Sequence, residues 1–67
     1  MFSKDFRDDN TLRFYDAKII YNDDTDSELC DWLTRGDIEY IVSTLGNVAK
    51  IIEVDSNGKK ISTLYEE

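Results

Sequence analysis

The chain has 67 residues, and its 15 acidic against 8 basic residues give a formal net charge of −7. This charge argues against ordinary nucleic-acid binding, because contacts with phosphates need Lys and Arg. The absence of histidine leaves no usual general base, and the single cysteine, Cys30, allows neither an intramolecular disulfide nor a zinc-type site. We therefore expect a protein that is not an enzyme, holds no cofactor or metal, and keeps Cys30 as a small core residue.

The length of the chain predicts one small domain, residues 1–67. A chain of this length buries only about 60% of the surface that it exposes when unfolded, so a monomer would be marginally stable. Oligomerisation is the remaining way to bury more apolar surface, and we expect a homodimer. Because no stretch resembles a signal peptide, a membrane span or a lipidation signal, we expect a cytoplasmic protein.

The first third of the sequence predicts an acidic segment followed by a strand. Residues 1–10 are polar and acidic, and we expect either a flexible arm or a short edge segment there. From 11 to 22 apolar and polar residues alternate, which is typical of a strand with one apolar face. That face would hold Tyr15, Ala17, Ile19 and Tyr21. The turn-forming residues 22–26 would follow.

Residues 27–33 fit a strand or a helix. As a helix, they would place Leu29, Trp32 and Leu33 on one face. As a strand, they would pair back on the first strand through the acidic turn, with Cys30 and Trp32 on one side and Leu29 and Leu33 on the other. We favour the strand, because a hairpin supplies a sheet on which the following helix can pack.

A helix followed by a strand is predicted between residues 34 and 54. Thr34 is a good N-cap and Asp37 stands three residues later, so the two can form an acidic variant of the capping box. Gly46 tolerates the left-handed conformation that ends many helices, and a β-branched run from Val48 predicts the next strand. The helix would carry an apolar stripe of Ile38, Ile41, Val42 and Leu45.

The C-terminal part, residues 56–67, predicts an extra hairpin strand and an acidic tail. Asn57-Gly58 is a hairpin signal, and residues 60–65 would return as an edge strand. The predicted fold class is α+β: a small antiparallel β-sheet with one helix packed on a face, in ββαββ order. Both sheet faces carry apolar residues, since Ile19 and Ile20 face opposite ways, which is a second argument for a homodimer.

A run of acidic residues distinguishes the first hairpin. Five acids and no base lie between residues 23 and 31, next to Trp32. These acids are Asp23, Asp24, Asp26, Glu28 and Asp31. A rigid scaffold that presents carboxylates around an apolar patch can occupy a DNA-binding groove. A solvated acidic turn beside core aromatics, in a protein whose charge serves solubility alone, explains the same pattern.

Three stretches of the chain carry a family resemblance. They are Y-D-A-K-I-I-Y-N-D-D (15–24), G-D-I-E-Y-I-V (36–42) and G-N-V-A-K-I-I-E-V-D (46–55). In this order they resemble the small acidic uracil-DNA glycosylase inhibitors of Bacillus phages that replicate by protein priming. The resemblance implies a dimeric DNA mimic with a hairpin, a helix and a further strand in each subunit.

The resemblance also implies a partner and a contact surface. The family occupies the DNA-binding cleft of the host uracil-DNA glycosylase, and its paired helices form an apolar pocket that captures the side chain which the enzyme inserts into DNA. Ile38 and Val42 stand where the family has aromatic pocket residues, so Tyr40 or Trp32 would complete the pocket. The acids that stand where the family has acids are Asp31 and Glu39. The remaining acids of the first hairpin would meet phosphate-binding loops of the enzyme.

Two other functions are compatible with the sequence. A different acidic phage inhibitor, of the anti-CRISPR or anti-restriction kind, would share the mimicry but not the target. A small acidic regulatory module would use its charge only for solubility. We expect no direct binding of nucleic acid and no membrane association in any of the three cases.

Overall fold

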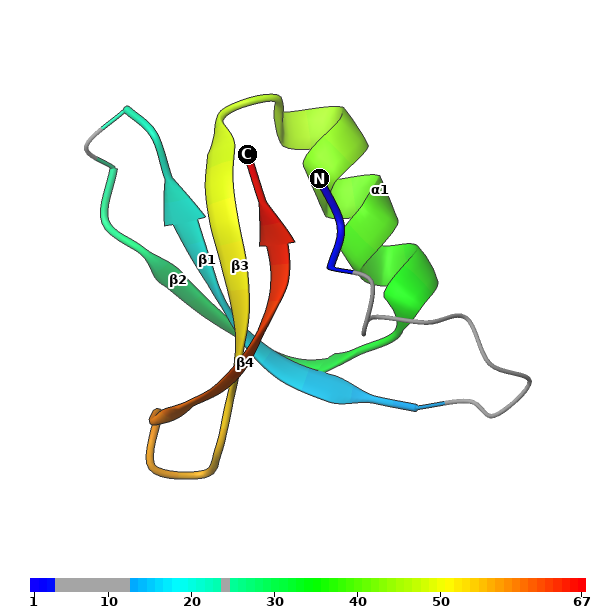
Figure 1. The fold of residues 1–67 in the computed structure, drawn as a ribbon, viewed down its shortest axis with the longest axis vertical. Coiled ribbons are helices and arrows are strands. Elements are labelled where there is room, and N and C mark those ends of the chain that lie inside the picture. The colour runs from blue at the N-terminus through cyan, green and yellow to red at the C-terminus, as the bar shows by residue number, and fades with distance from the viewer. Residues whose placement is uncertain (4–12, 24) are drawn as a thin grey trace.

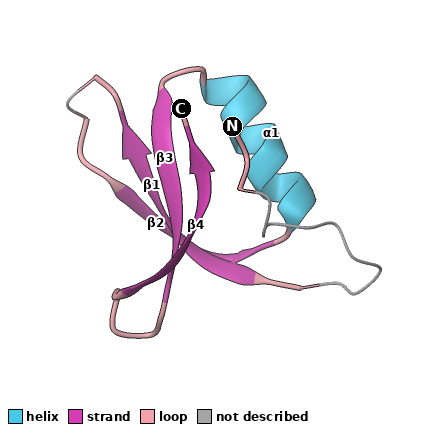
Figure 2. Cartoon of the chain, viewed as in Figure 1, coloured by secondary structure: helices cyan, strands magenta, loops and turns pink. Residues whose placement is uncertain are grey.

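The computed structural model describes residues 1–3, 13–23 and 25–67, which contain four strands and one helix (Figures 1 and 2). The elements are β1 (Tyr15–Tyr21), β2 (Glu28–Leu33), α1 (Arg35–Leu45), β3 (Val48–Val54) and β4 (Lys60–Glu66), in this order along the chain. Antiparallel pairing joins the strands into one sheet of order β2-β1-β3-β4. The predicted α+β class, with one antiparallel sheet and one helix, is confirmed.

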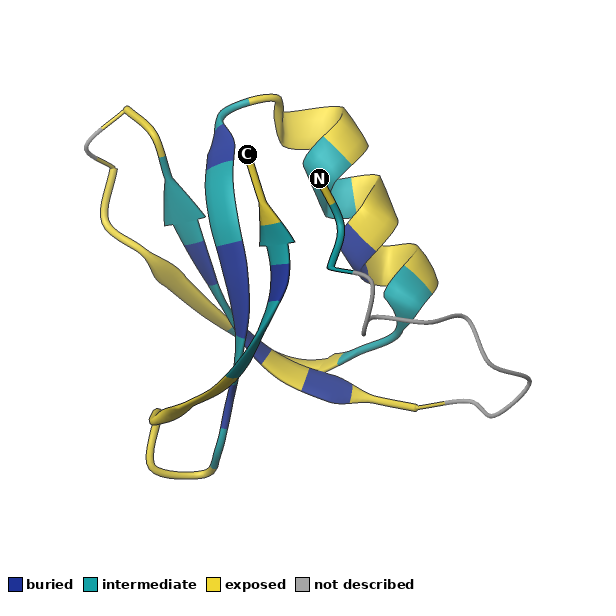
Figure 3. Cartoon of the chain, in the orientation of Figure 1, coloured by how far each residue is buried: buried dark blue, intermediate teal, exposed yellow. Residues whose placement is uncertain are grey.

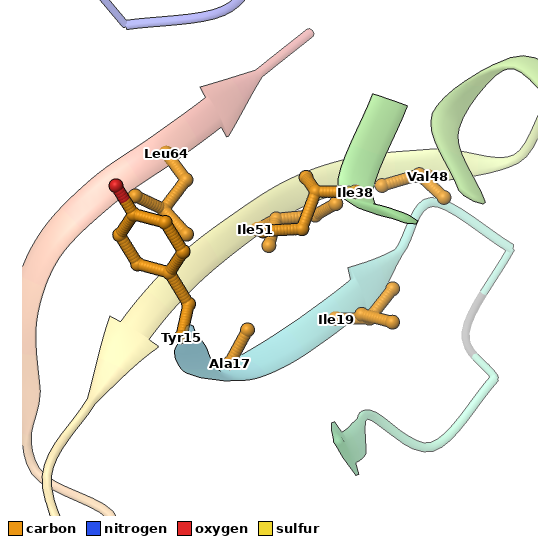
Figure 4. Close-up of a cluster of buried hydrophobic side chains, with 7 residues drawn as sticks. All are labelled: Tyr15, Ala17, Ile19, Ile38, Val48, Ile51 and Leu64. Carbon is orange, nitrogen blue, oxygen red and sulfur yellow. The ribbon is translucent and has the colours of Figure 1, made fainter. Parts of the chain in front are cut away.

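The core lies between α1 and one face of the sheet. Tyr15, Ala17 and Ile19 are buried as the alternation in β1 predicts, while Asp16 between them is exposed. Ile38 is the one fully buried residue of α1, and its side chain lies over Ile51 of β3, one of the two inner strands (Figure 4). The core cluster consists of Tyr15, Ala17, Ile19, Ile38, Val48, Ile51 and Leu64. Burial of each large aliphatic side chain in such a cluster stabilises the fold by about 2 kcal/mol.

Both predicted caps of α1 are confirmed. The Thr34 side chain accepts a hydrogen bond from the Asp37 backbone N–H, and the Asp37 carboxylate accepts one from the Thr34 backbone N–H at 3.0 Å. Gly46 ends the helix in the left-handed conformation at φ 70°. The chain can therefore leave α1 within two residues and enter β3 at Val48.

The β3–β4 hairpin is confirmed as predicted around Asn57-Gly58. The Asp55 carboxylate accepts hydrogen bonds from the backbone N–H groups of Asn57 and Lys59, both at 2.9 Å, and Gly58 supplies the positive φ of 80° that the turn needs. β4 follows as the last strand of the sheet, in agreement with the prediction of an edge strand.

The first three residues of the chain lie beside β4 (Figure 1). Phe2 forms an antiparallel bridge with Tyr65, and their rings meet at 5.1 Å in an edge-to-face arrangement. Ser3 donates a backbone hydrogen bond to Leu64 at 2.9 Å. Residues 1–3 thus form a short edge segment, one of the two alternatives expected for residues 1–10, and the rest of that stretch lies outside the described residues.

Residues 28–33 form a strand, so the strand alternative is confirmed, but the predicted assignment of side chains to its two faces is wrong. Tyr15 pairs with Leu33 and Ala17 with Cys30, so three steps along β2 match two steps along β1. The extra residue makes a β-bulge, and it shifts the alternation by one position. Cys30 and Leu33 therefore both pack against the core, whereas Leu29 and Trp32 are exposed.

The face of the sheet turned away from α1 is named the open face. Ile19 of β1 points into the core, so its neighbour Lys18 lies on the open face. Lys18 pairs with Ile52 on one side and with Leu29 on the other, so these two residues lie on the same face. Ile52 is 9% exposed despite its position there, while Leu29 remains 65% exposed. The expectation that apolar residues occupy both faces is thus correct.

Within the described residues, the eleven-residue helix α1 is neither long nor apolar enough to cross a membrane, and no other helix is present there.

Candidate protein-binding surface

The predicted helix residues separate into a buried and an exposed set. Ile38 has no exposed surface, and Val42, one turn later, is half-buried against the core cluster. Tyr40 is 69% exposed and points away from the sheet, since residues two positions apart on a helix lie on nearly opposite sides. Glu39 is exposed, and its carboxylate forms an ion pair with Arg35, whose Nε donates a hydrogen bond to it at 2.8 Å. Ile38 is therefore a core residue in this chain and has no surface for a partner to contact.

The predicted acids of the first hairpin lie along the loop after β1 and along β2. Asp23, Asp26, Glu28 and Asp31 are all exposed, as Figure 3 shows for this edge of the sheet. Asp24 lies outside the described residues. Three ion pairs occur among the described residues, and none of them involves an acid of this loop or of β2. No described basic side chain therefore forms an ion pair with the described carboxylates on this edge.

Two of these carboxylates are fixed by hydrogen bonds. Asp23 accepts from Thr25 and from the Asn47 side chain, and these bonds hold the pKa of its carboxyl below the ordinary value. Glu28 accepts from the Tyr21 hydroxyl at 3.0 Å. Burial, followed by this hydrogen bond to Glu28, raises the pKa of Tyr21, so the phenol stays protonated and continues to donate. These hydrogen bonds hold both carboxylates in position.

An exposed aromatic pair stands at the far end of β2. Trp32 is 76% exposed and its ring centroid lies 5.7 Å from that of Phe14, which is 50% exposed. Trp32 lies in the β-bulge and has a positive φ of 60°. It is the only non-glycine residue with a positive φ in the described chain. Such a conformation is uncommon for a bulky residue and is strained. The Trp32 backbone N–H donates to the Asp16 carboxylate at 3.4 Å.

A hollow of about 320 Å³ opens between β1, β2 and the turn that follows β3. Asp16, Asp31 and Asp55 line it together with Leu29 and Val54, and none of the described residues that line it is basic. Asp16 connects the two features, because it lines the hollow and also accepts the hydrogen bond from Trp32. The Asp55 carboxylate is already hydrogen-bonded to the backbone of the β3–β4 turn.

Cys30 of β2 is a free, partly buried cysteine. Its side chain packs against the core, and burial, with the nearby charges of Glu28 and Asp31, raises the pKa of the thiol. Among the described residues, no group of three or more acidic, cysteine or histidine side chains has the arrangement of a metal site.

Sequence reasoning missed Phe14, Asp16 and Asp55 as parts of one surface. The alternation in β1 put Asp16 on the polar face, and that was the available signal. The pairing of β1 with both β2 and β3 brings Asp16 close to Asp31 and Asp55, and no sequence pattern specified that strand order. Comparisons of the chain with protein-family models, curated proteins and solved structures gave no match.

Proposed function

We propose that the protein inhibits a host uracil-DNA glycosylase by occupying its DNA-binding cleft as a dimeric DNA mimic. The observation that carries this proposal is the series of exposed carboxylates along the first hairpin and β2, which no described ion pair neutralises. Glu28 and Asp31 lie on strand β2 and Asp23 is held by hydrogen bonds from Thr25 and Asn47, so these three acids keep their spacing when they meet the phosphate-binding groups of an enzyme. The resemblance of three sequence stretches to glycosylase inhibitors supports the same target.

The apolar part of the contact would come from α1. Tyr40 is 69% and Leu45 is 47% exposed, and Val42 is half-buried beside them. In a homodimer these side chains from two helices would form the pocket that receives the enzyme's DNA-inserting residue. Ile38 would support the pocket from beneath, as part of the core. Charge complementarity would mainly accelerate association, and the desolvated pocket would slow dissociation.

The test is uracil excision from a labelled single-stranded oligonucleotide by a bacterial uracil-DNA glycosylase, with increasing amounts of the protein. We expect stoichiometric loss of activity, with complete inhibition near two chains per enzyme. Absence of inhibition at a large excess of folded protein would reject this target. Inhibition of a nuclease with a basic DNA channel, under the same conditions, would then favour an inhibitor of the anti-CRISPR or anti-restriction kind.

The helix contribution has its own matched pair of variants. Tyr40→Ala should weaken inhibition about tenfold, because exposed aromatic anchors dominate many interfaces. Ile61→Ala removes a comparably exposed apolar side chain, 57% exposed, from β4 and should leave inhibition unchanged. Equal effects of the two substitutions would contradict the role given to α1.

A further inference from the structure

The turn between β3 and β4 places an asparagine directly before a glycine in an exposed stretch of backbone. Asn57 and Gly58 are both exposed, as Figure 3 shows for this turn, and Gly58 has a positive φ of 80°. Because Gly58 has no Cβ, the side-chain carbonyl carbon of Asn57 can approach the Gly58 backbone nitrogen without a steric barrier. The pair therefore allows a reaction between the Asn57 side chain and the backbone that follows it.

The side chain of Asn57 is also free to move, unlike those of the other described asparagines. Asn22 donates a side-chain hydrogen bond to Glu67 at 3.0 Å, and Asn47 donates one to Asp23 at 2.9 Å. The side-chain amide of Asn57 has no hydrogen-bond partner within the described residues. Rotation of this side chain toward the backbone thus breaks no hydrogen bond of the fold.

The residue after each asparagine differs in the same direction. Gly58 follows Asn57, whereas the residues after the other three asparagines of the chain are Thr11, Asp23 and Val48. A side chain beside the attacking nitrogen hinders it, most of all a β-branched one such as that of Val48, which is buried. Among the described asparagines, Asn57 alone combines a free side chain with an unhindered neighbour.

We propose that Asn57 is a site of spontaneous covalent modification, at which its side-chain amide is lost through a cyclic imide formed with Gly58. The Gly58 nitrogen gives its proton to hydroxide and forms a bond to Asn57 Cγ. The bond from Cγ to the side-chain nitrogen breaks, and that nitrogen takes a proton from water and leaves as ammonia. Asparagine is accordingly one of the thermolabile residues of proteins.

Water then opens the cyclic imide in one of two ways. Cleavage of the bond between the nitrogen and Cγ gives aspartate with the ordinary backbone. Cleavage of the bond between the nitrogen and the main-chain carbonyl carbon gives isoaspartate, whose backbone runs through Cγ and is longer by a carbon atom. Both products add a negative charge to the turn.

The hydrogen bonds of the turn limit the rate of this reaction. The Gly58 N–H donates to the Asp55 carbonyl oxygen at 2.9 Å, and the Asp55 carboxylate accepts from the N–H groups of Asn57 and Lys59. Loss of the Gly58 proton therefore breaks a hydrogen bond, and the fixed turn restricts the approach of Cγ to the nitrogen. We expect Asn57 to react more slowly in the folded protein than in the unfolded chain.

Isoaspartate would disrupt the turn that slows its formation. A longer backbone between Asn57 and Lys59 separates the two N–H groups that the Asp55 carboxylate holds. The β3–β4 hairpin places Leu64, which is 3% exposed, in the core. The isoaspartate form should consequently be less stable than the native protein, whereas aspartate changes only the charge.

The first experiment keeps the folded protein at mildly alkaline pH and follows each asparagine by mass spectrometry of tryptic peptides. Cleavage after lysine and arginine places the four asparagines in separate peptides, residues 8–13, 19–35, 36–50 and 51–59. We expect conversion of amide to acid to be roughly tenfold faster at Asn57 than at Asn22 or Asn47, because glycine leaves the attacking nitrogen unhindered. Equal rates at these positions, or no conversion of Asn57, would overturn the proposal.

The role of the turn is tested with two variants of equal charge. Asp55→Ala removes the carboxylate that holds the turn, and Asp26→Ala removes an exposed carboxylate from the loop after β1. Conversion of Asn57 should be several-fold faster in Asp55→Ala and unchanged in Asp26→Ala, with circular dichroism verifying that both are folded. Native protein in urea is a reference that needs no variant. A rate there that does not exceed the rate in the folded protein would reject the control assigned to Asp55.

The products are compared with variants at the same position. Anion exchange separates the modified chains by their added charge, and Asn57→Asp carries that charge on an ordinary backbone. The isoaspartate form should unfold at a lower temperature than Asn57→Asp, and equal midpoints would contradict the effect on the hairpin. Asn57→Gln should abolish the charge change, since glutamine is longer and forms its cyclic imide slowly. An unaltered rate in Asn57→Gln would place the reaction elsewhere and reject Asn57 as the site.

This inference goes beyond the proposed function and does not depend on it. None of these measurements uses a glycosylase, so a failure of the inhibition test leaves the Asn57 site standing, and a stable Asn57 leaves the inhibition standing.

Discussion

Ile38 and Tyr40 stand two residues apart in α1 and have opposite environments. Ile38 is 0% exposed and lies over Ile51, while Tyr40 is 69% exposed. Both residues were candidates for a partner pocket on the basis of the sequence. An apolar residue at helical spacing fits a core and a pocket equally well, so only the position of the sheet relative to α1 separates the two roles.

Truncation at Ile38 should reduce stability far more than truncation at Tyr40. We expect Ile38→Ala to lower the free energy of unfolding by about 2–4 kcal/mol, because it leaves a cavity in the core. Tyr40→Ala should change it by about 0.5 kcal/mol at most, since the side chain is exposed. Urea denaturation followed by circular dichroism measures both values, and similar losses would contradict the packing described for α1. Ile38→Asp would place a charge in the core, so its effect on folding would be measured before any effect on binding.

At the scale of elements, the capping residues at its two ends determine where α1 begins and ends. Its first turn is closed by the reciprocal hydrogen bonds of Thr34 and Asp37, and its last residue is followed by Gly46 in the left-handed conformation. These local signals depend on neighbouring residues alone, so the sequence was sufficient to predict them. The bulge in β2 is different, because it depends on the register in which β2 pairs with β1. It breaks the alternation of side chains that the sequence of β2 predicts.

Two glycine substitutions in α1 and its cap should have opposite effects. Gly46→Ala should destabilise the protein by about 1 kcal/mol, because alanine is disfavoured at a φ of 70° although its Cβ would meet no atom within 4 Å. Gly36→Ala should stabilise it by about 0.5–1 kcal/mol, because its Cβ would meet only Thr34 Oγ1 at an ordinary 3.9 Å and alanine favours a helix. Thermal denaturation of both variants measures the sign, and a shared sign would contradict the described helix end.

At the scale of the whole molecule, the charge is unevenly arranged. Ion pairs join Arg13, just before β1, to Glu53 of β3, Lys50 of β3 to Glu66 of β4, and Arg35 to Glu39 on the helix. The loop after β1 and strand β2 have no such pairs among their described acids. The four described acids of this edge, Asp23, Asp26, Glu28 and Asp31, therefore face a partner without forming any of the described ion pairs.

Salt should change the rate of association with the basic partner more than the rate of dissociation. Raising the ionic strength from about 0.05 M to about 0.5 M shortens the screening length several-fold, so the association rate constant for the glycosylase should fall at least tenfold. The dissociation rate constant should change less than threefold, because buried contacts control it. Surface plasmon resonance resolves both constants. An association rate independent of salt would indicate that the acidity serves only solubility.

The sequence by itself determined the α+β class, the caps of α1, the buried face of β1 and the β3–β4 turn. These features follow from patterns within about a dozen residues, namely alternation, capping and turn-forming pairs. The tertiary structure alone decided that Ile38 belongs to the core, that Trp32 is exposed by a bulge, and that Asp16, Asp31 and Asp55 share one hollow. Each of these depends on which strands pair and in which register, and contacts between distant residues set that pairing.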